Sequence, residues 1–253
     1  MVMTTTERIN KIIEVLRTVD IFSNKFNKEI QEMINMHRKQ GGSIEYVYVQ
    51  HYYNEIHGLS QFFQYLLRDN GNRRYTFFAV RAAMEILLQL EYVFRLKKLG
   101  DDKVFVLLSK DVAQSVAATN AAAPPDPNHS IHAVVRKFDD ANKILKTSFD
   151  LNVVKSNTKP FPDIHSLCEK SAVTIKNYRG IDIYHLYVMY SEPNHVRLIS
   201  HNTTSRDNDY KTCLALEIFI EIYVRFYELI LKTNGFPIGF SKELKSIKDI
   251  LGL

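Results

Sequence analysis

Apolar residues recur every three or four positions along most of this chain, a spacing that predicts amphipathic α-helices. Glycine, proline and short polar runs interrupt the pattern and mark helix ends. Alternation of the kind typical of strands is confined to a short run around Tyr46 and Tyr48, where the flanking pattern favours helix. The pattern therefore predicts an all-α protein.

Local signals set the expected helix bounds. Thr4 and Glu7 have the spacing of a capping box, and Gly41 and Gly42 supply a stop for the helix that it opens. Lys97 and Lys98 shortly before Gly100 are typical of a helix C-terminus. We expect the later helices at about residues 43–69, 73–99, 101–120, 132–149, 163–178, 207–233 and 241–251.

Long helices joined by short loops predict an antiparallel bundle. The prolines between Ala121 and Asn128 cannot continue a helix and mark the clearest loop. We expect a single helical domain over residues 1–253, with a core bundle at about 4–120 and 163–234, a loop-rich excursion at 121–162 and a short C-terminal helix at 241–251.

The stretch "YHLYVMYSEPNHVRLISH" is a helical pattern that Pro193 interrupts. Ser191 precedes this proline as an N-cap would, with Pro193 in the first turn of a new segment. The break would place Ser191 and His195 at a helix junction, where free backbone N–H groups can hold an anion.

Five polar side chains stand out on these apolar helices. Arg81 and Glu85 lie four residues apart on a helix that is apolar on nearly every side, so we expect a buried ion pair. Tyr187, Ser191 and His195 recur every four residues and share one helix face. We expect all five to converge on a buried or cleft-lining polar cluster.

Such a cluster fits catalysis or structure. As a site, His195 is the general base or acid, Ser191 or Tyr187 orients it, and Arg81 holds a phosphate while Glu85 aims the arginine. As structure, the ion pair fixes helix register. A Ser191 nucleophile would need an orienting carboxylate and an oxyanion hole, and the sequence identifies neither.

Composition narrows the classes of function. The net charge of +5 favours polyanionic partners, although no block of like charges forms a nucleic-acid arm. Phosphate-binding glycine loops, dinucleotide fingerprints and zinc-protease motifs are absent from the sequence, so we expect no cofactor and no metal site. Cys168 and Cys213 match no metal or redox spacing, and we expect reduced, partly buried thiols in a cytoplasmic protein.

The best candidate for a membrane span, residues 213–231, is interrupted by charge. Each charge at a bilayer centre costs roughly 2.5 to 3.5 kcal/mol, which argues against insertion. The charges recur at intervals of three and four, so we expect a core helix with one polar stripe and no membrane partner. The stripe consists of Glu217, Glu221, Arg225 and Glu228.

Two resemblances add to this. The R-x-x-x-E helix at Arg81, paired with the later Y-x-x-x-S-x-x-x-H segment at Tyr187, resembles a large family of uncharacterised bacterial all-helical proteins; it covers roughly residues 70–235 and implies a fold with a polar centre. More distantly, Arg179 and His185 in "RGIDIYH" resemble the signature of the HEPN superfamily. That resemblance implies a metal-independent ribonuclease whose arginine and histidine act on the RNA 2'-hydroxyl and phosphate at a dimer interface.

Two functions are thus in competition. The leading expectation is an RNA-directed helical protein of the defence or stress type, which binds or cleaves RNA, or binds another phosphate-bearing ligand, without a metal. The alternative is a non-enzymatic interaction or sensor module whose polar cluster only fixes helix packing. Exposure discriminates between them, because a site is open to water and a structural network can be sealed. Long helices with several apolar faces also favour a homodimer.

Overall fold

The computed structural model describes most of the chain as helix. The described residues are 4–39, 45–68, 75–122, 160–171, 181–191 and 205–231, together with Lys245 and Asp249. Their helices are α1 (Thr5–Lys39), α2 (Glu45–Leu67), α3 (Thr76–Leu99), α4 (Asp101–Ala122), α6 (Ile164–Lys170), α7 (Ile183–Ser191) and α8 (Ser205–Leu231). The prediction of an all-α protein is confirmed.

The chain divides into two compact units. The first comprises Met1–Phe94 and Ile164–Leu253, and the second comprises Arg95–Asp163. The boundary falls within α3, so the second unit contains the end of α3 and all of α4. Most of the predicted excursion and the predicted helix at 132–149 lie outside the described residues.

Capping explains where the long helices begin and end. The N–H of Thr4 donates to Glu7 Oε2 at 2.7 Å, and the N–H of Glu7 donates to Thr4 Oγ1 at 3.3 Å, which confirms the capping box. At the C-terminus of α3, Gly100 has a φ of 131°, in a region of backbone conformation that favours glycine. Its N–H donates to the Lys97 carbonyl at 3.1 Å, and α4 begins at the next residue.

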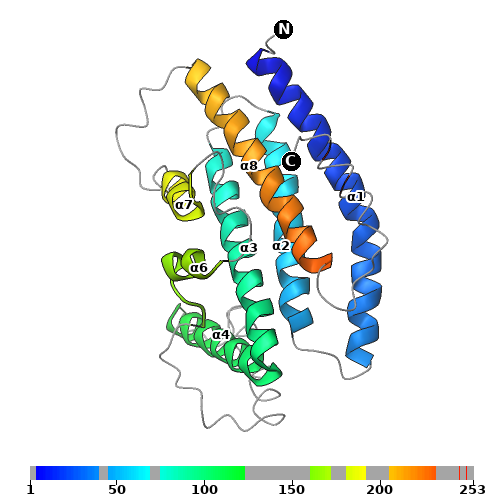
Figure 1. The fold of residues 1–253 in the computed structure, drawn as a ribbon, viewed down its shortest axis with the longest axis vertical. Helices are drawn as coiled ribbons and strands as arrows, with labels where there is room; N and C mark the ends of the chain where they lie inside the picture. Colours follow the sequence, from blue (N-terminus) through cyan, green and yellow to red (C-terminus); the bar gives the residue numbers. More distant parts are fainter. Residues whose placement is uncertain are drawn as a thin grey trace. The chain divides into compact units, whose positions relative to one another are not determined.

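The core of the first unit lies among α1, α2 and α8. Figure 1 shows these three helices side by side, and α1 packs against both of the others. Phe63 of α2 lies against Phe219 of α8, with ring centroids 4.3 Å apart. Tyr53 and Tyr227 meet edge to face at 6.3 Å. These fully buried rings supply the apolar burial that holds the long helices together.

α8 is a core helix, as predicted, and three residues of its charged stripe are also largely buried. Arg225 Nη1 lies 2.8 Å from Glu228 Oε2, and Arg225 Nη2 lies 3.8 Å from Glu221 Oε1. All three side chains are at most 19% exposed. Among the helices described, none is both long and apolar enough to cross a membrane.

Hydrogen bonds between helices place α3. The hydroxyl of Tyr52 on α2 donates to Gln89 Oε1 on α3 at 2.8 Å. Just beyond α6, the hydroxyl of Ser171 donates to Glu91 Oε2 at 2.6 Å. Together these contacts hold α3 between α2 and the segment that contains α6.

The structure tests the predicted extent of α6, the state of the two cysteines and part of the C-terminal helix. The helix expected at 163–178 was wrong in its extent, since α6 ends at Lys170 and Ser171 lies outside it. The N–H of Ser171 still donates to the Cys168 carbonyl at 3.2 Å, a bond three residues back that closes the last turn. The rest of the predicted range, residues 172–178, lies outside the described residues. Cys168 and Cys213 are buried and form no disulfide, as expected, and burial raises the pKa of the Cys168 thiol to about 11. Of the predicted C-terminal helix, only Lys245 and Asp249 are described, and both are helical.

Candidate functional site

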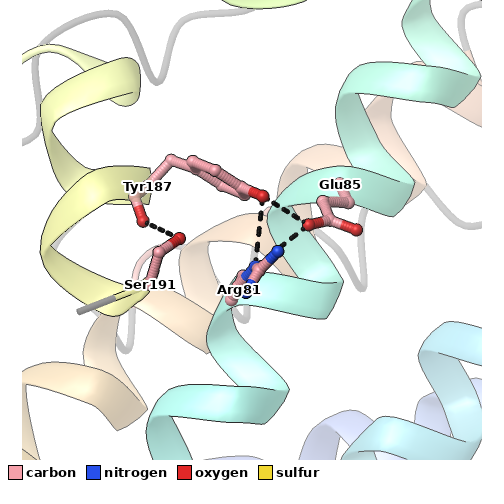
Figure 2. Close-up of polar contacts among 4 residues, drawn as sticks. All are labelled: Arg81, Glu85, Tyr187 and Ser191. Atoms are coloured by element: carbon pink, nitrogen blue, oxygen red, sulfur yellow. Dashed lines mark hydrogen bonds and ion pairs between the residues drawn. The ribbon is translucent and has the colours of Figure 1, made fainter. Parts of the chain in front are cut away.

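Three of the five predicted polar side chains meet at the junction of α3 and α7 (Figure 2). The Nε–H of Arg81 donates to Glu85 Oε1 and to the Tyr187 hydroxyl oxygen, each at 3.1 Å. The Tyr187 O–H in turn donates to Glu85 Oε1 at 2.7 Å. Arg81, Glu85 and Tyr187, here called the α3–α7 cluster, therefore share a closed set of hydrogen bonds.

Helix geometry and ring packing set up this arrangement. Arg81 and Glu85 lie one turn apart on α3, so their side chains are neighbours on one face. Phe77 of α3 packs against Tyr190 of α7, with ring centroids 5.6 Å apart, and fixes the two helices next to each other. The Arg81 guanidinium also lies 5.2 Å from the centre of the Tyr187 ring, a favourable cation–π distance.

The expectation that this ion pair is buried was wrong. The side chains of Arg81 and Glu85 are each 33% exposed, and Phe78 on the same helix is 43% exposed. α3 packs through residues such as Phe77 and Gln89, and the strip that carries Phe78, Arg81 and Glu85 remains at the surface. A helix that is apolar on nearly every side need not be covered on every side, and the sequence pattern alone misses this.

The electrostatics keep the arginine charged. Partial burial opposes the charge on Arg81, but the contacts with Tyr187 and Glu85 outweigh it and raise its pKa. Burial and the Glu85 carboxylate raise the pKa of the Tyr187 phenol, which therefore stays protonated and donates to that carboxylate. The cluster thus consists of a guanidinium, a carboxylate and a neutral hydroxyl.

Only one nitrogen of the guanidinium is used within this cluster. Both hydrogen bonds of Arg81 involve Nε, and Nη1 and Nη2 have no hydrogen-bond partner in the part of the chain that the structure describes. Those two nitrogens carry the planar pair of donors that matches two oxygens of a phosphate or carboxylate. The geometry therefore suits Arg81 to receive an anion while Glu85 and Tyr187 fix its orientation.

Ser191, another predicted site residue, bonds within its own helix and does not join the cluster. Ser191 is the last residue of α7, and its hydroxyl donates to the Tyr187 carbonyl at 2.7 Å (Figure 2). It thus bonds the carbonyl four residues earlier in its own helix, as serine often does. The segment that Ser191 was predicted to cap, which begins with Pro193 in its first turn, lies outside the described residues. His195 and Arg179 lie outside the described residues.

His185 has a partner that sequence reasoning missed. Asp182 accepts hydrogen bonds from the N–H groups of Tyr184 and His185 at 2.9 and 3.1 Å, and its other oxygen pairs with His185 Nδ1. These bonds lower the pKa of Asp182. The His185 imidazole is 72% exposed and lies two residues from Tyr187, on a different face of α7 from the α3–α7 cluster. An aspartate directly before an apolar helical run was the available signal.

Neither a metal-binding group nor a similar known protein helps to identify the function of the site. Within the described ranges, no group of three or more histidine, cysteine, aspartate or glutamate residues is arranged to hold a metal ion. Comparisons with protein-family models, with curated proteins and with solved structures found no match. A functional conclusion therefore rests on the residues of this chain.

Proposed function

We propose that the protein is an RNA-directed helical protein of the defence or stress type, which binds an RNA phosphate at Arg81 without a metal ion. One observation carries this proposal. The guanidinium is held through Nε by Glu85 and Tyr187, is one-third exposed, and keeps two terminal nitrogens without a partner among the described residues. A guanidinium held in this way can bind a phosphate through Nη1 and Nη2 without breaking its bonds to Glu85 and Tyr187.

The terminal N–H groups of Arg81 determine which kind of ligand the site can bind. A planar pair of N–H donors binds two phosphate oxygens at once and gains both charge and directionality. Because Glu85 and Tyr187 already hold the side chain, less rotamer freedom is lost when the phosphate binds. The net charge of +5 adds a long-range attraction for a polyanion such as RNA.

RNA cleavage is the finer form of this proposal. His195 is the proposed general base or acid, four residues after Ser191 in the sequence, with Arg81 holding the phosphate. The weaker alternative, from the HEPN resemblance, assigns these roles to Arg179 and His185. His185→Ala and His195→Ala separate the two assignments. The variant that removes the catalytic histidine should abolish cleavage, the other should not, and neither should change RNA affinity.

The binding experiment is a titration of labelled RNA followed by fluorescence anisotropy. Arg81→Gln should weaken binding by roughly 10- to 150-fold, the loss of a hydrogen bond to a charged group. Arg17→Gln, which removes an exposed arginine on α1, is the matched control and should change affinity little. Equal affinities of Arg81→Gln and the unchanged protein would sink the proposal, as would an equal loss in the Arg17 control.

A second candidate is a non-enzymatic interaction or sensor module. It is favoured by the mutual satisfaction of Glu85 and Tyr187 and by the return of the Ser191 hydroxyl to its own helix. On that view the cluster only joins α7 to α3. Arg81→Gln would then lower stability while RNA binding is absent from the unchanged protein at low salt.

We further propose that the protein is a cytoplasmic homodimer. The support is the apolar character of the helices on more than one face, including exposed large apolar side chains such as Met36 and Met189. Light scattering coupled to size-exclusion chromatography should give twice the mass of one chain. A monomer at all accessible concentrations would refute this part.

A further inference from the structure

Two exposed aromatic side chains continue the strip of α3 that carries Arg81. Tyr75, just before α3, and Phe78, in its first turn, precede Arg81 at intervals of three residues. Tyr75 is 38% exposed and Phe78 43% exposed. Their rings are stacked, with centroids 6.1 Å apart and an interplanar angle of 29°. Tyr75, Phe78 and Arg81, here called the α3 strip, combine an aromatic pair with a guanidinium.

The contact between α3 and α7 is made by a ring other than Phe78. The neighbouring Phe77 is the ring that packs against Tyr190 and joins α3 to α7. Phe78 points about 100° around the helix from Phe77, away from that contact. Large apolar side chains exposed next to each other on a soluble surface are typical of an interaction site.

The spacing along the helix suits one kind of ligand. With a rise of about 1.5 Å per residue, Phe78 lies about 4.5 Å and Tyr75 about 9 Å from Arg81 along the axis of α3. Both rings therefore lie within two turns of Arg81 along the same helix. Aromatic faces that stack bases, next to arginines that bind phosphates, are the usual components of single-stranded nucleic-acid sites.

We propose that Tyr75 and Phe78 stack the unpaired bases of a single-stranded RNA whose phosphate is bound at Arg81. This inference rests on the proposed function and names its substrate class. The charge of Arg81, with its two terminal nitrogens unused in the described part of the chain, favours a polyanion over an apolar protein segment. Bases within a duplex are already stacked on each other, so the α3 strip should discriminate against double-stranded RNA.

The test compares three ligands on one protein by fluorescence anisotropy. They are a short labelled single-stranded RNA, the same sequence as a duplex, and an abasic strand of equal length that keeps the phosphates. Phe78→Ala should weaken single-strand binding by roughly 5- to 150-fold, the range for one lost base stack, and leave abasic binding unchanged. Phe78→Trp should retain binding.

A matched control removes a similar side chain elsewhere. Phe62 on α2 is 42% exposed, nearly the same as Phe78, and does not belong to the α3 strip. Phe62→Ala should leave all three affinities unchanged. An equal loss in Phe62→Ala and Phe78→Ala would show a general effect of surface apolarity and would overturn the proposal, as would preferred binding of the duplex.

Failure of this inference is distinguishable from failure of the proposed function. If Arg81→Gln weakens binding of both the intact and the abasic strand while Phe78→Ala changes neither, Arg81 binds phosphate and base stacking is refuted. If Phe78→Ala instead converts a dimer to a monomer in light scattering without affecting RNA affinity, the α3 strip is a surface for a second copy. Absence of RNA binding by the unchanged protein overturns both proposals.

Discussion

Partial exposure of the Arg81–Glu85 pair sets the size of its contribution to stability. Removing one partner of a fully buried ion pair lowers the free energy of unfolding by about 3 to 5 kcal/mol. Removing one partner of an exposed pair lowers it by about 1 kcal/mol or less. With both side chains 33% exposed, Arg81→Ala should lower the free energy of unfolding by about 1 kcal/mol. Urea denaturation measures this. A loss of about 3 kcal/mol or more would mean that the pair behaves as buried.

Glu221 makes the stability of the protein depend on pH. Burial, the largest effect, and the nearby Glu228 raise its pKa, although Arg225 opposes them. A carboxyl with a raised folded pKa binds its proton more tightly in the folded state, so its contribution is largest at low pH and is lost as pH rises through the folded pKa. The charged form of Glu221 is thus the destabilising one.

Glu221→Gln tests this by removing the titration. The free energy of unfolding of the variant, relative to that of the unchanged protein, should be most favourable at neutral pH and decline as pH falls toward 4.5, the unshifted value. Urea denaturation at several pH values gives the difference. Glu14→Gln, at an exposed position on α1, supplies the background. A difference that is independent of pH would contradict the raised pKa.

At the scale of helices, α7 depends on its cap. It has 9 residues, too few to be stable alone, and Asp182 accepts two N–H groups at its start. Asp182→Ala should destabilise the protein by about 1 kcal/mol, while Asp182→Asn, which can still cap, should cost less. Hydrogen exchange of the α7 amides shows whether the loss is local. Equal effects of both variants would assign the loss to the His185 pairing.

Helix positions were the most predictable part of the molecule, because their signals are local. The capping box at Thr4 and the stop at Gly100 need only nearby residues, and both were found as expected. The end of α6 at Lys170 was missed because residues 171–178 contain no glycine or proline that would mark it. The bond from the Ser171 hydroxyl to Glu91, which lies 80 residues away in the sequence, leaves no local pattern either.

The candidate site was predictable to the same extent. Periodicity placed Arg81 beside Glu85, and the four-residue row placed Tyr187 on a helix face that meets them. Periodicity did not predict that the Ser191 hydroxyl would bond the Tyr187 carbonyl, because it gives the direction of a side chain and not its hydrogen-bond partner. Exposure of Phe78 was also hidden, because it depends on what other helices leave uncovered.

For the molecule as a whole, phosphate contacts and base stacking differ in how they make the proposed RNA affinity depend on salt. Each phosphate neutralised on a single strand adds about 0.7 to the slope of log affinity against log salt. Base stacking releases no counterions from phosphates and adds nothing to that slope. The proposed RNA binding therefore has two separable contributions: phosphate neutralisation, by Arg81 and by the net charge of +5, and stacking on the Tyr75–Phe78 pair.

Salt titration of RNA binding separates these two contributions. Arg81→Gln should lower the affinity and reduce the magnitude of the slope by about 0.7, since one phosphate contact is lost. Phe78→Ala should lower the affinity at every salt concentration and leave the slope unchanged. A reduced slope in Phe78→Ala would mean that the ring acts by positioning Arg81. An unchanged slope in Arg81→Gln would place the phosphate contact on another residue of the chain.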